Sequence, residues 1–188
     1  AGYTEGDFIP VQHRRRKIGG NKHVRTSIII GDSMIRNIKG KRLANKLVKQ
    51  KVFVKPHGGC KVGDIRYHII PEMKRPDPAD NIIVHVGTNE IATRKPAANI
   101  ANDIISTCSQ IKNDVNSISV SGIIYRSKEE ENVKVNQVNS ILEKACRENG
   151  FNFIDNSNIH TKMLADGLHL DKPGYDILFN NFLLNLNY

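Results

Sequence analysis

The sequence predicts an α/β fold, a three-layer α/β/α sandwich in which helices cover both faces of a five-stranded parallel sheet. Short β-branched runs alternate with longer segments of helical apolar spacing from residue 26 to residue 188. This alternation is typical of parallel strands joined by crossover helices. The clearest run, Ile28 to Ile30, is apolar throughout, as expected of a strand buried on both faces. It ends at Gly31, and helical spacing begins directly after that glycine.

The remaining elements follow in order from the same local patterns. Helical spacing over residues 34–50 is interrupted near Gly40, and its apolar stripe includes Val48. Residues 62–73 are expected to form a helix with Ile70 among its inward residues. The other strands are expected at 52–54, 81–86, 117–124 and 151–154, and the other helices at 97–115, 131–149 and 173–186.

Length and composition bound the class of protein. The 188 residues fit one domain. No apolar run approaches the ~20 residues needed to span a bilayer, and no secretory signal is evident at the start. Cys60, Cys108 and Cys146 are odd in number and widely spaced, which fits neither a disulfide framework nor a zinc site. The seven histidines lack metal-ligand spacing as well. We therefore expect an intracellular, cytoplasmic protein without a metal or cofactor.

The net charge of +9 is concentrated in the N-terminal third. Residues 1–25 hold six Lys/Arg and two acids, and residues 33–63 hold nine Lys/Arg and no acid. Such one-sided basicity favours phosphate-rich partners, either RNA or an anionic membrane surface. A solvated lysine-rich helix face explains the same charges equally well. Residues 1–25 have the composition of a flexible basic tail or of a linker to an upstream domain, and self-association stays open. The candidate basic surface comprises Arg14, Arg15, Arg16, Lys17, Arg36, Lys39, Lys41 and Arg42.

Unusual turns follow several of the predicted strands, and the carboxyl ends of parallel strands meet at one edge of a sheet, where ligands bind. Ser33 is the candidate nucleophile, because a serine at a helix start has an exposed hydroxyl and an unused backbone N–H. His169 would accept its proton, and Asp166 would hold the imidazole in the required tautomer. Gly59 and Asn89 would join the Ser33 amide as three donors to an oxyanion.

Each of these features also has a plainer interpretation when it is taken alone. Asp32 would simply cap the following helix. Asn89 would be a turn residue, His169 a surface histidine, and His85 a core or edge histidine of its strand. Asp171 is a second-choice acid for His169, although it falls towards the last helix. The plainer interpretations weaken because all the features occur together, each at the end of a predicted strand or in the last loop.

The same residues identify a family resemblance over residues 26–188. Four motifs resemble the four sequence blocks of the SGNH (GDSL-type) hydrolase superfamily, namely Gly31-Asp32-Ser33-Met34, Gly59, Gly87-x-Asn89 and Asp166-x-x-His169. The resemblance implies a flavodoxin-like sandwich with a five-stranded parallel sheet, small acyl ester substrates and no cofactor. It also implies a catalytic triad of Ser33, Asp166 and His169, and an oxyanion hole of Ser33, Gly59 and Asn89.

Longer stretches resemble a narrower group within this superfamily. I-I-I-G-D-S-M-I-R-N-I-K-G, N-I-I-V-H-V-G-T-N-E and D-G-L-H-L-D-K-P-G are similar to the esterase domain of first-open-reading-frame proteins from non-LTR (LINE-type) retrotransposons, which resembles platelet-activating-factor acetylhydrolases. This implies an acetyl esterase within an RNA-packaging protein, present in cytoplasmic ribonucleoprotein particles. Glu90 departs from the usual Asp, and we expect this change to matter little because Asn89 is the donor.

Two functions follow from the sequence. The first is a serine esterase acting on a small acyl ester or a phospholipid. The second is a binding module for RNA or anionic phospholipid, in which hydrolysis is incidental or lost.

Overall fold

The computed structural model describes residues 23–188, so the predicted basic run from Arg14 to Lys17 lies outside the described residues. Five strands form one sheet in the order β2-β1-β3-β4-β5, and every neighbouring pair is parallel. The strands are β1 (Arg25–Gly31), β2 (Gln50–Pro56), β3 (Asn81–His85), β4 (Ser117–Ser121) and β5 (Asn152–Ile154). The predicted five-stranded parallel sheet is therefore confirmed.

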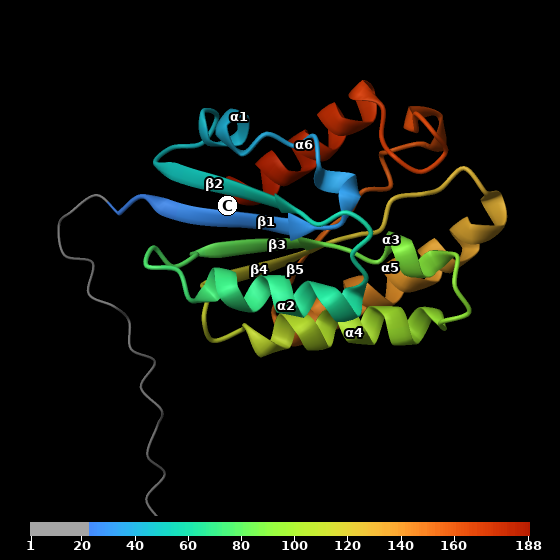
Figure 1. The fold of residues 1–188 in the computed structure, drawn as a ribbon, viewed down its shortest axis with the longest axis horizontal. Helices are drawn as coiled ribbons and strands as arrows, with labels where there is room; N and C mark the ends of the chain where they lie inside the picture. Colours follow the sequence, from blue (N-terminus) through green and yellow to red (C-terminus); the bar gives the residue numbers. More distant parts are fainter. Residues whose placement is uncertain (1–22) are drawn as a thin grey trace, which may run out of the picture.

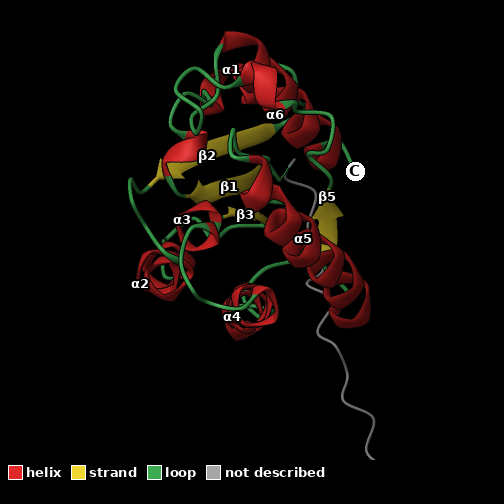
Figure 2. Cartoon of the chain, turned by 90° about the vertical axis from the view of Figure 1, so that its right-hand side faces the viewer, coloured by secondary structure: helices red, strands yellow, loops and turns green. Residues whose placement is uncertain are grey.

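Helices cover both faces of the sheet, which makes three layers (Figures 1 and 2). One face carries α1 (Gly40–Ala44) and α6 (Lys172–Leu186), and the other carries α2 (Val62–Met73), α4 (Ala97–Gln110) and α5 (Glu129–Asn149). Strand β1 lies between two hydrophobic cores. Ile29 packs in the core that contains Phe182 of α6, whereas Ile28 and Ile30 pack in the core that contains Ile65 of α2. Side chains that alternate between two buried faces explain the uniformly apolar run.

Short helices gather at the end of the sheet to which the strands point (Figure 1). These are η1 (Ser33–Ile35), α3 (Thr88–Ile91) and η2 (Thr161–Met163). The interruption expected near Gly40 within residues 34–50 is observed, since η1 ends at Ile35 and α1 begins at Gly40, but α1 already ends at Ala44. The chain passes very close to β2 at Gly40. A Cβ at Gly40 would lie 2.3 Å from the Val52 carbonyl oxygen. This close approach is a tertiary contact that helical spacing does not report.

Three further expectations need correction. The expected tail ended at residue 25, but Arg25 begins β1 and its N–H donates to the Lys49 carbonyl at 2.9 Å. Ile70 is 41% exposed, because α2 buries the side that carries Val62, Ile65 and Ile69. Val48 is 79% exposed, because it lies beyond the end of α1, where helical spacing no longer applies.

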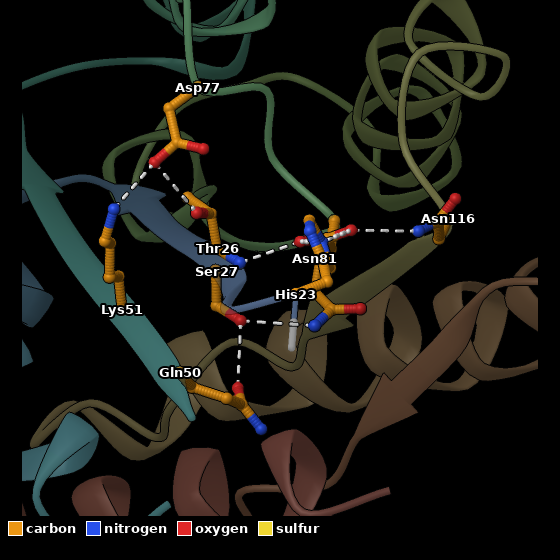
Figure 3. A network of polar contacts seen from close by, with 9 residues as sticks. His23, Thr26, Ser27, Gln50, Lys51, Asp77, Asn81 and Asn116 are labelled. Atoms are coloured by element: carbon orange, nitrogen blue, oxygen red, sulfur yellow. Dashed lines mark hydrogen bonds and ion pairs between the residues drawn. The ribbon is translucent and has the colours of Figure 1, made fainter. Parts of the chain in front are cut away.

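The amino end of the sheet is held by polar side chains (Figure 3). The Asp80 carboxylate accepts the Thr26 N–H at 2.8 Å. The Ser27 hydroxyl donates to Gln50 Oε1 at 3.3 Å and accepts from Asn81 Nδ2 at 3.2 Å. These bonds join the starts of β1, β2 and β3, and they satisfy Thr26 and Ser27, which are fully buried. The amino ends of these three strands are therefore tied together by side chains.

Within the described part of the chain, no helix has the length and apolar character to cross a membrane. All three cysteines are buried free thiols.

Candidate active site

Ser33 lies where β1 gives way to η1. A Cβ at Gly31 would lie 2.0 Å from the His85 carbonyl oxygen, so glycine is required for β1 and β3 to approach this closely. Asp32 then caps η1, since its Oδ1 accepts the Met34 N–H at 3.0 Å. This tight strand-to-helix turn leaves Ser33 partly exposed at the carboxyl edge of the sheet.

The structure brings Ser33, His169 and Asp166 together, although 136 positions separate the serine from the histidine. The Ser33 Oγ lies 3.0 Å from His169 Nε2. On the other side of the ring, His169 Nδ1 lies 2.8 Å from Asp166 Oδ2. This is the hydroxyl–imidazole–carboxylate order in which an imidazole can take the hydroxyl proton while a carboxylate stabilises the imidazolium.

The loop that carries Asp166 and His169 is a closed turn. Asp166 Oδ1 accepts the His169 N–H at 2.6 Å and the Leu168 N–H at 3.0 Å. Gly167 turns the chain with φ +80°, and a Cβ there would meet the Ser127 hydroxyl at 2.6 Å. The hydrogen bond from the His169 ring, followed by the two N–H groups, lowers the pKa of the Asp166 carboxyl well below its usual range. Asp166 is therefore ionised at neutral pH, and its hydrogen bonds hold its side chain in place.

The three expected oxyanion donors lie on three different segments at the same edge. Gly59 has φ +72°, a conformation that favours glycine, and nothing lies within 4 Å of the position where a Cβ would be. The Ser33 and Gly59 backbone N–H groups donate to no other residue within 23–188. Asn89 Nδ2 donates to the Cys60 carbonyl at 2.9 Å, which ties α3 to the Gly59 turn. Its amide keeps a second N–H.

For two other residues the structure supports the plainer interpretation. Asp171 caps α6, since its Oδ1 accepts the Gly174 N–H at 2.8 Å, so it is not the acid that orients His169. His85 is buried in β3 with Nδ1 2.8 Å from the Ser121 Oγ, and burial lowers its pKa to about 4. A neutral core histidine of this kind has no part in the site.

The contacts of two residues near the site are not predicted by the sequence patterns. Glu90 was expected to matter little, yet it is only 3% exposed and its Oε1 accepts the Val62 N–H at 2.6 Å. Arg126 donates to the Thr88 carbonyl at 2.8 Å and also pairs with Glu131. Both residues hold α3, which carries Asn89. Helix or strand periodicity does not predict either contact, because each joins segments that are far apart in the sequence.

The described part of the candidate basic surface follows β2, the outer strand of the sheet. A cavity of about 430 Å³ is lined by Arg36, Lys39 and Lys41, with Val54 among its apolar residues. Within residues 23–188 these three cations have no ion-pair partner. Arg42 differs, because it pairs with Asp176 at 3.2 Å and stacks over Phe179 at 4.5 Å from the ring centroid. The described residues contain no group of three or more metal-ligating side chains.

Solved structures with the same fold include known esterases. A catalytic mutant of Axe2, an acetylxylan esterase from Geobacillus stearothermophilus, aligns with a TM-score of 0.74 at 15% identity, covering 88% of this chain and 95% of that chain. A member of the lipolytic protein G-D-S-L family from Veillonella parvula DSM 2008 aligns with a TM-score of 0.75 at 17% identity, covering 85% of this chain and 97% of that one. No protein-family model and no curated protein sequence matches the chain. At these identities the likeness establishes the fold, which is that of the SGNH hydrolases.

Proposed function

We propose that this protein is a serine esterase that hydrolyses small acyl esters, acetyl esters above all. The observation that carries the proposal is the unbroken chain of short contacts from the Ser33 hydroxyl through His169 to the Asp166 carboxylate, at 3.0 and 2.8 Å. The shared fold with an acetylxylan esterase supports the same reaction class. The sequence resemblance to acetylhydrolase-like domains supports the acetyl group as the acyl group.

The reaction proceeds in two halves. His169 Nε2 takes the Ser33 proton as Oγ attacks the ester carbonyl carbon, and the carbonyl oxygen becomes an oxyanion held by the Ser33 and Gly59 N–H groups and the Asn89 amide. The C–O bond then breaks, and His169 delivers its proton to the departing alcohol. Water repeats the attack on the acyl-serine with His169 as the base, which releases the acid and restores Ser33.

Hydrolysis of p-nitrophenyl acetate tests this proposal. Ser33→Ala and His169→Ala should each lower kcat by on the order of 10³-fold or more, with an unchanged circular dichroism spectrum. His160→Ala, at an exposed histidine outside the site, is the matched control and should keep full activity. An ester series from acetyl to octanoyl should show falling kcat/KM. Undiminished hydrolysis by Ser33→Ala protein would exclude Ser33 as the nucleophile.

A second function, binding of a phosphate-bearing partner, is favoured by Arg36, Lys39 and Lys41 along β2, which pair with no acid among residues 23–188. RNA and anionic phospholipid both present phosphates, and the resemblance to RNA-packaging proteins makes this function and a cytoplasmic ribonucleoprotein setting part of the proposal. Binding of RNA and of phosphatidylserine vesicles should weaken steeply with salt. At a given salt concentration, the double variant Lys39→Gln and Lys41→Gln should bind more weakly than the unmodified protein. The double variant Lys46→Gln and Lys49→Gln, at exposed lysines outside the cavity, should lose less affinity. Absence of binding to either ligand at low salt would exclude this function.

A further inference from the structure

Two buried acids, Asp32 and Glu90, are sequence neighbours of two residues of the proposed oxyanion hole. Asp32 is 1% exposed and Glu90 is 3% exposed. Each satisfies one carboxyl oxygen, since Asp32 accepts the Met34 N–H at 3.0 Å and Glu90 accepts the Val62 N–H at 2.6 Å. The other two oxygens, Asp32 Oδ2 and Glu90 Oε2, are buried without a hydrogen-bond partner among the described residues. An ionised carboxylate in such a place is strongly disfavoured.

These acids are connected to all three expected oxyanion donors. Asp32 directly precedes Ser33, and Glu90 directly follows Asn89. The Val62 N–H that Glu90 accepts belongs to the first residue of α2, three positions after Gly59. The two carboxyl groups are also close enough for the charge of Glu90 to raise the pKa of Asp32. The two acids therefore contact or adjoin the segments that carry all three expected donors.

Burial and the neighbouring groups act differently on the two acids. Burial raises the pKa of Glu90, whereas the Val62 N–H, Lys95 and Lys61 favour its ionised form. The Met34 and Thr88 N–H groups and His169 favour the ionised form of Asp32, whereas Glu90 opposes it. The Cys60 thiol lies near both acids. Burial is the main cause that raises the pKa of Asp32 to about 7, and Glu90 adds to this rise. The two lysines beside Glu90 favour the negative charge there over Asp32, where burial dominates.

We propose that Asp32 and Glu90 form a positioning pair that carries one negative charge, on Glu90, so that Asp32 stays neutral beside Ser33 while the oxyanion forms. This inference rests on the proposed esterase function. The hydrogen bonds of the pair hold η1 and the start of α2, and hence two donor segments, in place. Ionisation of Asp32 puts a second negative charge beside a developing one, which destabilises the transition state and slows hydrolysis.

The test is the pH dependence of kcat/KM for p-nitrophenyl acetate, with the rate of Ser33→Ala protein subtracted. Hydrolysis by the unmodified protein should fall severalfold above about pH 7. Asp32→Asn keeps the cap on Met34 and cannot ionise, so this fall should disappear. Glu90→Gln keeps the acceptor for Val62 and removes the repulsion, so Asp32 ionises more readily and the fall should move to lower pH.

Opposite shifts in the two variants support the inference, because a merely structural role would lower the rate equally at every pH. Asp64→Asn, at an exposed acid of α2, is the matched control and should leave the profile unchanged. A fall that persists at the same pH in Asp32→Asn protein, or that stays in place in Glu90→Gln protein, overturns the inference.

A second measurement separates this inference from the proposed function. The ¹³C carboxyl shift of Asp32 in the Ser33→Ala protein should show a protonated group at pH 6, and an ionised group there overturns the inference even if Asp32→Asn protein fails to fold. If the unmodified protein hydrolyses no faster than Ser33→Ala, the esterase proposal fails instead.

Discussion

Replacement of Asp32 by asparagine should change the pH dependence of stability in a direction that the structure fixes. Burial raises the pKa of Asp32 from 3.8 to about 7. Between these two values the folded protein holds a proton that the unfolded chain has lost. The free energy of unfolding therefore falls as pH rises through this window, and it levels off above pH 7. The asparagine side chain cannot titrate, so the variant lacks this fall.

The size of the effect follows from the same values. Between pH 5 and the Asp32 pKa of about 7 lie about two pH units, and each changes the free energy of unfolding by about 1.36 kcal/mol. The unmodified protein therefore loses about 2.7 kcal/mol of stability between pH 5 and pH 8. This is a large part of a typical domain stability of about 5–15 kcal/mol. His85, whose pKa burial lowers to about 4, gives the opposite trend, because it loses stability as pH falls. It is present in both proteins and cancels in their difference.

Urea unfolding followed by circular dichroism at pH 5 and pH 8 measures this difference. The stability of Asp32→Asn relative to the unmodified protein should improve by about 2.7 kcal/mol between the two pH values. Asp64→Asn, which replaces an exposed acid, should show no such improvement. Equal m-values are needed so that midpoint shifts report stability. A difference that is the same at both pH values would refute the reasoning.

Three further outcomes follow from other parts of the structure. Gly59→Ala should lower stability in urea by about 1 kcal/mol, because Gly59 has φ +72°; an unchanged midpoint would contradict that. Arg126→Met, which loses the bond to the Thr88 carbonyl, should lower kcat about tenfold with little change in KM, as steady-state kinetics would show; equal kcat would argue against a positioning role. The Cys108 and Cys146 thiols, whose pKa burial raises to about 12, should react with Ellman's reagent only after unfolding, and rapid labelling of the folded protein would disprove their burial.

The fold could be predicted wherever local pattern and burial agree. The apolar run from Ile28 to Ile30 is fully buried, and the helix expected over 62–73 is observed as Val62–Met73. Errors occurred where a tertiary contact decides the conformation. The interruption expected near Gly40 is observed, but the helical spacing expected to continue to residue 50 ends at Ala44, and Gln50 instead begins β2 beside β1.

In the candidate site as well, the positions set by local pattern could be predicted and those set by tertiary contacts could not. Ser33 and Asn89 each follow a strand, so the topology of a parallel sheet alone predicts that they meet at one edge. Their supporting contacts could not be predicted in this way. Arg126 reaches Thr88 across 38 positions, and Glu90 reaches Val62 across 28. Such contacts depend on how α2 and the segment after β4 pack against α3, which no local spacing encodes.

The burial of Asp32 also bears on why an acid occupies this position. Asn caps a helix start as well as Asp does, so the bond to the Met34 N–H alone does not require a carboxyl group. A buried Asp costs stability above neutral pH, whereas Asn does not. Capping alone therefore does not distinguish Asp from Asn at this position. A group that is neutral when protonated and negative when ionised, placed directly before Ser33, makes the charge next to the oxyanion depend on pH. In the proposed mechanism, the residue that shapes the turn also sets the charge beside the nucleophile.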